Sequence, residues 1–92
     1  MKVTSVKITK IEDEETSRLK GIADIVLNDM IAIHDIRIIE GHEGLFIAMP
    51  CRELYDEDGE LSGEYRDIVH AVNVEVRDIL AKAIIDEYNK LA

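Results

Sequence analysis

The feature that most constrains the fold is a pair of apolar runs joined by a short glycine turn. The runs, Met30 to Ile39 and Leu45 to Met49, are rich in isoleucine and are separated by Gly41-x-x-Gly44. Two strand-forming runs with a glycine turn between them are typical of a β-hairpin. The first run carries apolar residues on both parities, which indicates a central strand with both faces at least partly covered.

Two further strands are predicted ahead of this hairpin. Val3 to Ile11 is rich in strand-forming residues, and Leu19 to Leu27 places apolar residues at alternate positions. The dipeptide Asn28-Asp29 predicts a tight turn into the third strand. Pro50 cannot donate to a strand ladder and should end the fourth strand. Three consecutive hairpins favour an antiparallel meander.

The chain after Pro50 is interpreted as a polar loop followed by a helix. Asp56-Glu57-Asp58-Gly59 predicts a turn, and Tyr65 to His70 predicts a short return strand. Asn73 suits a helix N-cap, and Glu75 suits the positive end of the helix dipole. The apolar stripe of the helix comprises Val76, Ile79, Leu80, Ala83, Ile84, Tyr88 and Leu91. We expect one α+β domain over residues 1–92, with this C-terminal amphipathic helix packed on one face of the meander.

The net charge of −9 argues against a generally basic, nucleic-acid-binding surface. Four of the acids form the run Glu12–Glu15, predicted as a hairpin loop, and the segment from Arg52 to Glu64 has a net charge of −5. The remainder of the chain is neutral. A local basic face on the part of the chain outside these two acidic segments is therefore compatible with the net charge. The basic candidates for a nucleic-acid site near the start of the helix are Arg52, Arg66, Arg77 and Lys82.

No residue pattern predicts catalysis, a metal or a cofactor. The three histidines and one cysteine lack the spacings that place metal ligands together. Cys51 has neither a base nor an oxyanion-hole signature near it in the sequence. Asp56-x-Asp58-Gly59 resembles part of a calcium loop, but Leu54 and Tyr65 would occupy its first and twelfth positions. We expect a protein that is not an enzyme.

The charged pair Asp35 and Arg37 has two interpretations. Residues two apart on a strand point to the same side, so an ion pair within the sheet or across a dimer interface is expected. The functional alternative is that Arg37 contacts a ligand phosphate. Among the aromatic residues, Phe46 is expected in the core and Tyr88 in the packing of the helix.

The N-terminus lacks the apolar core of a signal peptide, and no apolar run approaches the roughly 20 residues of a membrane span. A single cysteine cannot form an internal disulfide, which is typical of a reducing compartment. We therefore expect a cytoplasmic protein with no membrane contact.

Three segments in this order resemble the motifs of the SpoVG family: His34–Gly41, Gly44–Pro50 and Tyr65–His70. The resemblance implies a small α+β fold, a homodimer, a role in septation and sporulation, and site-selective binding of DNA and RNA. The sequence departs from the family pattern in two places. After the second motif the family commonly has Lys-Arg or similar, whereas Cys51-Arg52-Glu53 keeps one basic residue and has Cys51 where serine is usual. Ala71 stands where proline is usual after the third motif. A longer, acidic loop also follows the second motif.

Together these observations predict a non-enzymatic regulator of septation or sporulation that acts as a homodimer through DNA or RNA. The alternative, from another class, is a protein-interaction module that uses its acidic loops or a sheet edge and binds no nucleic acid.

Overall fold

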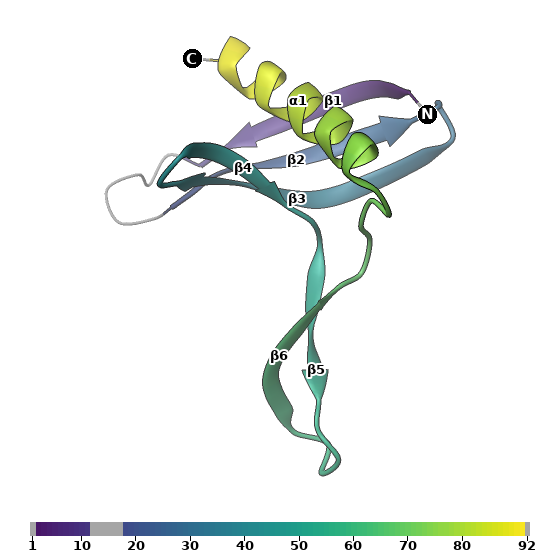
Figure 1. The fold of residues 1–92 in the computed structure, drawn as a ribbon, viewed down its shortest axis with the longest axis vertical. Helices are drawn as coiled ribbons and strands as arrows, with labels where there is room; N and C mark the ends of the chain where they lie inside the picture. Colours follow the sequence, from purple (N-terminus) through teal and green to yellow (C-terminus); the bar gives the residue numbers. More distant parts are fainter. Residues whose placement is uncertain (1, 12–17, 92) are drawn as a thin grey trace.

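The computed structural model describes residues 2–11 and 18–91, which form an α+β fold (Figure 1). Four strands form an antiparallel sheet in the order β1-β2-β3-β4, and two more form a separate two-stranded sheet. The elements are β1 (Val3–Lys10), β2 (Leu19–Leu27), β3 (Ile31–Gly41), β4 (Gly44–Ala48), β5 (Cys51–Tyr55), β6 (Leu61–Asp67) and α1 (Val74–Lys90). The predicted meander with a C-terminal helix is confirmed. In the described part of the chain, no helix has the length and apolarity needed to cross a membrane.

The turn between β2 and β3 forms where the sequence predicts it. Asn28 and Asp29 have φ angles of 52° and 54°. They occupy the centre of a β-turn that the Met30 N–H closes by donating to the Leu27 carbonyl oxygen at 2.9 Å. Asn and Asp tolerate such left-handed values well. The acidic run Glu12–Glu15, predicted as a hairpin loop, lies outside the described residues.

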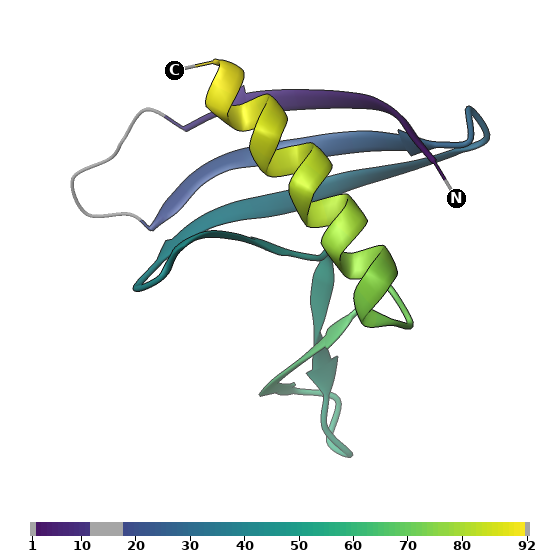
Figure 2. The ribbon, with the colours of Figure 1, turned by 45° about the horizontal axis from the view of Figure 1, so that its top comes forward.

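The hydrophobic core lies between one face of the sheet and α1, which crosses the sheet as Figure 2 shows. Alternate residues of β2 point toward the helix, because successive side chains of a strand project to opposite faces. The buried core comprises Ala23, Ile25, Leu27, Ile33, Ile36, Ile38, Ile47, Met49, Leu80 and Ile84. Each large aliphatic side chain buried in this way contributes about 1.5–3 kcal/mol to folding.

The helix begins at its predicted cap. The side-chain oxygen of Asn73 accepts a hydrogen bond of 2.9 Å from the third helical N–H, and Glu75 lies in the first turn. Two members of the predicted stripe are wrong, since Ile79 and Leu91 are 45% and 47% exposed. Ile79 lies about 100° around the helix from the buried Leu80. Leu91 is the C-cap residue and lies beyond the last full turn.

A β-bulge in β3 changes which residues face the helix. Ala23 pairs with Ile36 and Ile25 pairs with Ile33. A step of two positions along β2 therefore matches a step of three positions along β3, so β3 carries one extra residue. Asp35, inside the bulge, has a φ of 63°. The extra residue reverses the alternation of side chains. Ile33 and Ile36 therefore both face the core, whereas the uninterrupted alternation predicted opposite faces.

The segment after Pro50 is a β-hairpin rather than the predicted loop. β5 and β6 pair with each other and extend away from the four-stranded sheet (Figure 1). The predicted turn is confirmed, because Asp56 Oδ1 accepts hydrogen bonds from the backbone N–H groups of Asp58 and Glu60 at 2.9 and 3.0 Å. The return strand is Leu61–Asp67 rather than Tyr65 to His70. All seven of its residues are exposed, so no apolar alternation indicated it.

Candidate nucleic-acid interface

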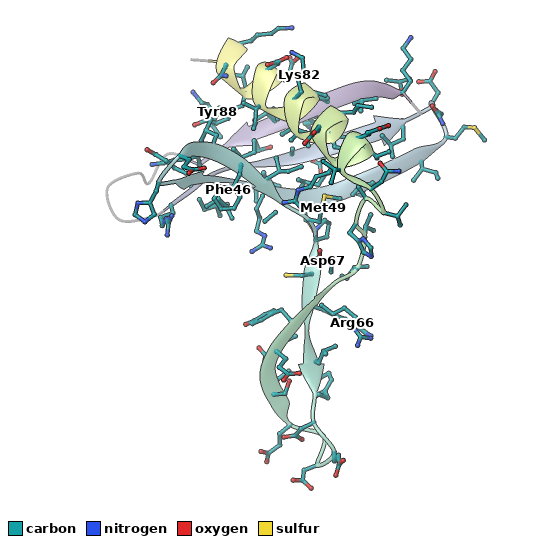
Figure 3. All side chains as sticks on the ribbon, in the orientation of Figure 1. Phe46, Met49, Arg66, Asp67, Lys82 and Tyr88 are labelled. Carbon is teal, nitrogen blue, oxygen red and sulfur yellow. The ribbon has the colours of Figure 1, made fainter. Side chains whose placement is uncertain are left out.

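Two of the predicted nucleic-acid-binding residues lie side by side on the β5–β6 hairpin. Arg52 and Arg66 are directly opposite in the antiparallel register. Their side chains therefore project from the same face, with Cβ atoms about 5 Å apart. Both are exposed, and Figure 3 shows Arg66 on the hairpin, pointing away from it. Like charges placed directly opposite destabilise a strand pair, so this arrangement costs the hairpin stability unless an anion lies between the two groups.

The other two predicted residues, Arg77 and Lys82, lie on α1, where both are exposed. The Nζ of Lys82 is 3.1 Å from the Oδ2 of Asp86, which neutralises part of its charge. Figure 3 shows Lys82 on the helix and Arg66 along the hairpin, so the structure does not bring these two together. Two of the four residues thus lie on the β5–β6 hairpin and two on α1, and a shared site at the loop-to-helix junction stays a prediction.

The opposite face of the hairpin carries Glu53 and Tyr65, which are also register partners. The Tyr65 hydroxyl donates a hydrogen bond of 3.1 Å to Glu53 Oε1, and the Gly63 N–H donates one of 3.2 Å to Oε2. The hydrogen bond to a carboxylate, and then the negative charge of that carboxylate, raise the pKa of Tyr65 above its ordinary value of 10.0. Glu53 is thereby held in the hairpin's own network, on the face away from the arginine pair.

The electrostatic surroundings of the arginine pair are acidic. Residues Cys51–Asp67 contain seven acids and two arginines, a net charge of −5. Long-range attraction of a polyanion to this hairpin is therefore unfavourable. A phosphate group would have to come within about 10 Å of the arginines, the Debye length at 0.1 M salt, before it is attracted to them.

The predicted ion pair between Asp35 and Arg37 is not formed within the described residues. Arg37 instead donates from Nη2 to the carbonyl oxygen of Met49 and to the Sγ of Cys51, both at 3.4 Å. The bulge at Asp35 separates the directions of the two side chains. An Arg37 contact across a dimer interface or with a ligand phosphate stays a prediction.

The histidines lie in separate parts of the described chain. His34 Nδ1 is 3.1 Å from Asp24 Oδ1 on the neighbouring strand, His42 lies in the β3–β4 turn, and His70 Nδ1 is 3.0 Å from the carbonyl oxygen of Ala71. Among the described residues, no group of three or more His, Cys, Asp or Glu side chains is placed to hold a metal ion.

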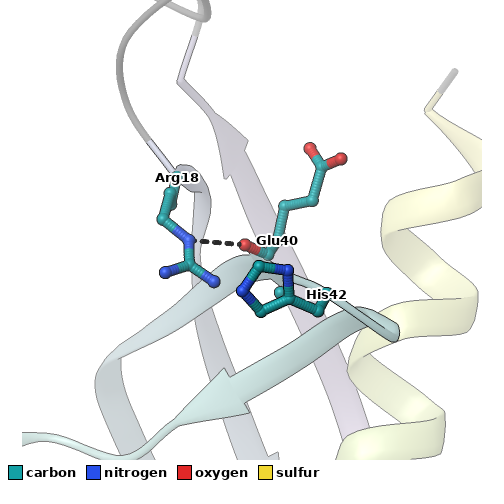
Figure 4. Close-up of a pocket in the computed structure, with 4 residues that line it drawn as sticks. Arg18, Glu40 and His42 are labelled. Atoms are coloured by element: carbon teal, nitrogen blue, oxygen red, sulfur yellow. Dashed lines mark hydrogen bonds between the residues drawn. The ribbon is translucent and has the colours of Figure 1, made fainter.

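A hollow at the β3–β4 turn brings together residues that the sequence did not connect. Its volume is about 660 Å³. Nearby, the Arg18 Nε donates a hydrogen bond of 3.0 Å to the carbonyl oxygen of Glu40, and Figure 4 shows the Arg18 guanidinium beside the ring of His42. The residues that line the hollow are Arg18, Gly41, His42, Glu43, Gly44, Leu45 and Phe46.

Phe46 is the residue of this hollow whose placement was predicted wrongly. It was expected in the core, and its side chain is 43% exposed. Ile47 is buried against the helix side of the sheet, so its neighbour Phe46 must point to the opposite face. The alternation of β4 was the signal that could have identified this exposed aromatic ring.

Comparison with known proteins agrees with the three sequence motifs. The family model named SpoVG matches residues 1–90. The chain belongs to the SpoVG family. A relative named "Putative septation protein SpoVG" from Phytoplasma australiense is 48% identical over 88 residues, which cover 96% of this chain and 83% of the relative. The protein of the same name from Clostridium perfringens (strain ATCC 13124) is 43% identical over 91 residues, covering 99% and 92%. That of Clostridioides difficile (strain 630) is 41% identical over 90 residues, covering 98% and 89%.

The SpoVG motifs serve mainly as framework in this structure. His34–Gly41 forms most of β3, and Gly44–Pro50 includes β4; together they supply the buried residues Ile36, Ile38, Ile47 and Met49. Of the four predicted nucleic-acid contacts, Arg66 alone lies within a motif.

Proposed function

We propose that this protein is a cytoplasmic, non-enzymatic regulator of septation and sporulation that acts as a homodimer by binding DNA or RNA. The observation that carries the proposal is the SpoVG match over residues 1–90, together with relatives named as septation proteins. The opposed pair Arg52 and Arg66 supports the nucleic-acid part, because a phosphate between two exposed guanidinium groups would offset their repulsion.

The homodimer is supported by large apolar side chains that the helix does not cover. Met30 and Ile31 at the β2–β3 turn are 83% and 62% exposed, and Ile68, Val72 and Val74 before and at the start of the helix are 62% to 87% exposed. A domain of this size buries only about two-thirds of its unfolded surface, so a second copy adds useful stability. A two-fold interface would cover the same patch on both subunits.

Sedimentation equilibrium at micromolar concentration tests the dimer directly. We expect a mass about twice the 10.4 kDa of one chain. A mass of one chain at all concentrations would remove the dimer from the proposal.

Fluorescence anisotropy with mixed-sequence DNA and RNA pools tests nucleic-acid binding. With about three or four phosphates bound, the slope of log affinity against log salt should be roughly −3 on duplex DNA. The double substitution R52A/R66A should weaken binding to all sequences and flatten that slope by about one unit for each phosphate that the variant no longer neutralises.

The matched control is K2A/K7A, which removes the same charge from β1 and the residue before it. Both proteins must keep the wild-type melting curve. Equal losses of affinity in the two double variants would mean that net charge alone drives binding. No complex at low salt with folded protein would refute the nucleic-acid function.

The second candidate is a protein-interaction module that binds no nucleic acid. The hairpin favours it, because Tyr55, Leu61 and Tyr65 are 59% to 71% exposed within a strongly acidic segment. Exposed aromatic and apolar side chains with a surrounding negative charge suit a basic protein partner. A pull-down in parallel with and without nuclease discriminates the two functions, since only a complex bridged by nucleic acid disappears on digestion.

A further inference from the structure

Three hollows lie around the β3–β4 turn, and we call the largest of these three, which Phe46 lines, the turn groove. The hollow of about 660 Å³ shares Arg18, Gly41 and His42 with a second of about 400 Å³. A third hollow, of about 390 Å³, shares Gly44 and Leu45 with the turn groove and is lined by Tyr88 of the helix. Volumes of this size are in the range that holds small organic ligands.

Phe46 gives the turn groove an aromatic surface in a fixed position. The ring packs against Gly41, because a Cβ placed on that glycine would lie 2.9 Å from the ring Cε1 and 3.2 Å from Cδ1. Ile39 lies directly opposite Phe46 in the register, and Leu19 lies opposite Ile39 on the next strand. The ring is thus supported from the sheet side while 43% of the residue stays exposed. An aromatic ring that is supported on one side and partly exposed suits the stacking of a planar base.

Arg18 and His42 give the same groove hydrogen-bond donors. The bond from Arg18 Nε to the Glu40 carbonyl orients the guanidinium beside the ring of His42 (Figure 4), and both residues line the turn groove. The carboxylate of Glu40 is paired with Lys20 Nζ at 3.4 Å, so its charge is compensated. Glu43 is the opposing charge among the lining residues. One cation beside one exposed acid gives a weak anion site, and binding here would need the aromatic contact as well.

We propose that the turn groove binds a nucleotide unit of single-stranded RNA or DNA. The base stacks on Phe46, the Arg18 guanidinium contacts the adjacent phosphate, and His42 donates a hydrogen bond to the sugar-phosphate backbone. A duplex does not fit this arrangement, because its bases are stacked on one another and are not available to a side-chain ring. This inference rests on the proposed function and adds to it the strandedness of the nucleic acid and a second site, away from the arginine pair.

The test measures anisotropy of a labelled uridine 12-mer, a labelled thymidine 12-mer and a duplex of mixed sequence. Wild-type protein should bind the single strands at least several times more tightly than the duplex. F46L keeps an apolar side chain but removes the stacking face, and should lower single-strand affinity by about tenfold. R18A should flatten the single-strand salt slope by roughly 0.7, which corresponds to one phosphate.

K2A is the matched control for charge, because the Lys2 carbonyl bonds to Asn28 at the other end of the sheet. It should leave the preference for single strands unchanged. Variants are compared only where circular dichroism shows a wild-type fold. As a measurement that needs no variant, the backbone amides of residues 41–46 should shift in heteronuclear NMR spectra when the uridine 12-mer is added.

The outcomes separate the two proposals. If wild-type protein binds nucleic acid but F46L and R18A bind as well as K2A, and the turn amides do not shift, the turn groove is refuted while the proposed function stands. Equal affinity for duplex and single strand also refutes the groove. If wild-type protein binds none of the three probes, both proposals fail.

Discussion

The Nζ of Lys10 lies 5.2 Å from the centre of the Tyr88 ring, so a residue at the end of β1 contacts the last turn of α1. The same ammonium donates a hydrogen bond of 3.3 Å to the carbonyl oxygen of Leu91. A cation at this end of a helix also interacts favourably with the helix dipole. The pair therefore fastens the C-terminal end of the helix to the edge strand of the sheet.

Removing that ammonium should loosen the end of the helix. We expect K10M to lower the free energy of unfolding by about 0.5–1 kcal/mol, the usual value of an exposed cation–π contact. K7M, on the same strand, is the control and should have a smaller effect. Urea melts measure both, and equal reductions would show that the Lys10–Tyr88 contact contributes nothing specific.

Two isoleucines of α1 provide a matched test of the core face. Ile84 is fully buried and Ile79 is 45% exposed. I84A should lower the free energy of unfolding by about 2–5 kcal/mol, because it removes packed methyl groups and leaves a cavity. I79A should cost clearly less, since part of its side chain is already in water. Denaturant melts that gave the same destabilisation at both positions would contradict the orientation of the helix.

The bulge residue Asp35 should accept few replacements. Its φ of 63° is unfavourable for β-branched side chains, and its N–H bonds to Asp24 Oδ1 at 3.3 Å. We expect D35V to lower the free energy of unfolding by about 1–2 kcal/mol more than D35N does, since Asn tolerates the left-handed region. Thermal unfolding of the two variants and of D35G checks this, with D35G expected to stay close to wild type. A D35V protein as stable as D35N would argue against the bulge.

The Tyr65–Glu53 hydrogen bond predicts a specific dependence on pH. Because the pKa of Tyr65 is raised, any stability from this bond is present below the ordinary value of 10.0 and is lost as pH rises through the folded-state pKa. E53Q should bring the pKa of Tyr65 back down, because the charged acceptor is removed. NMR titration of the Tyr65 ring in both proteins measures the difference. An unchanged pKa in E53Q would exclude Glu53 as the cause.

The strands of the four-stranded sheet were predictable where burial on one face leaves an alternating pattern. β2 has the predicted bounds because its apolar residues alternate and Asn28 follows directly. The bulge at Asp35 was not predictable, because residues around it are apolar at both parities and any register satisfies the pattern. The β5–β6 hairpin was missed for the opposite reason, since β6 is exposed along its whole length and carries no burial pattern.

The residues of the candidate site also differ in how far the sequence could predict them. Arg52 and Arg66 were identified as basic residues, but their direct opposition depends on the register of a hairpin that the sequence did not predict. Arg18 and His42 are 24 positions apart in the chain and come together only through the pairing of β2 with β3 and the turn after it. The exposure of Phe46 could have been predicted from the alternation of side chains along β4.

The base of the hairpin is closed by one backbone bond, in which the Ile68 N–H donates to the Pro50 carbonyl oxygen at 2.7 Å. The chain thus leaves and rejoins the main fold at neighbouring points. The intervening residues can change in length or charge while the two anchor points stay in place. The length and charge of the hairpin can therefore vary during evolution without a change in the four-stranded sheet and helix, and a protein engineer could replace it with another hairpin.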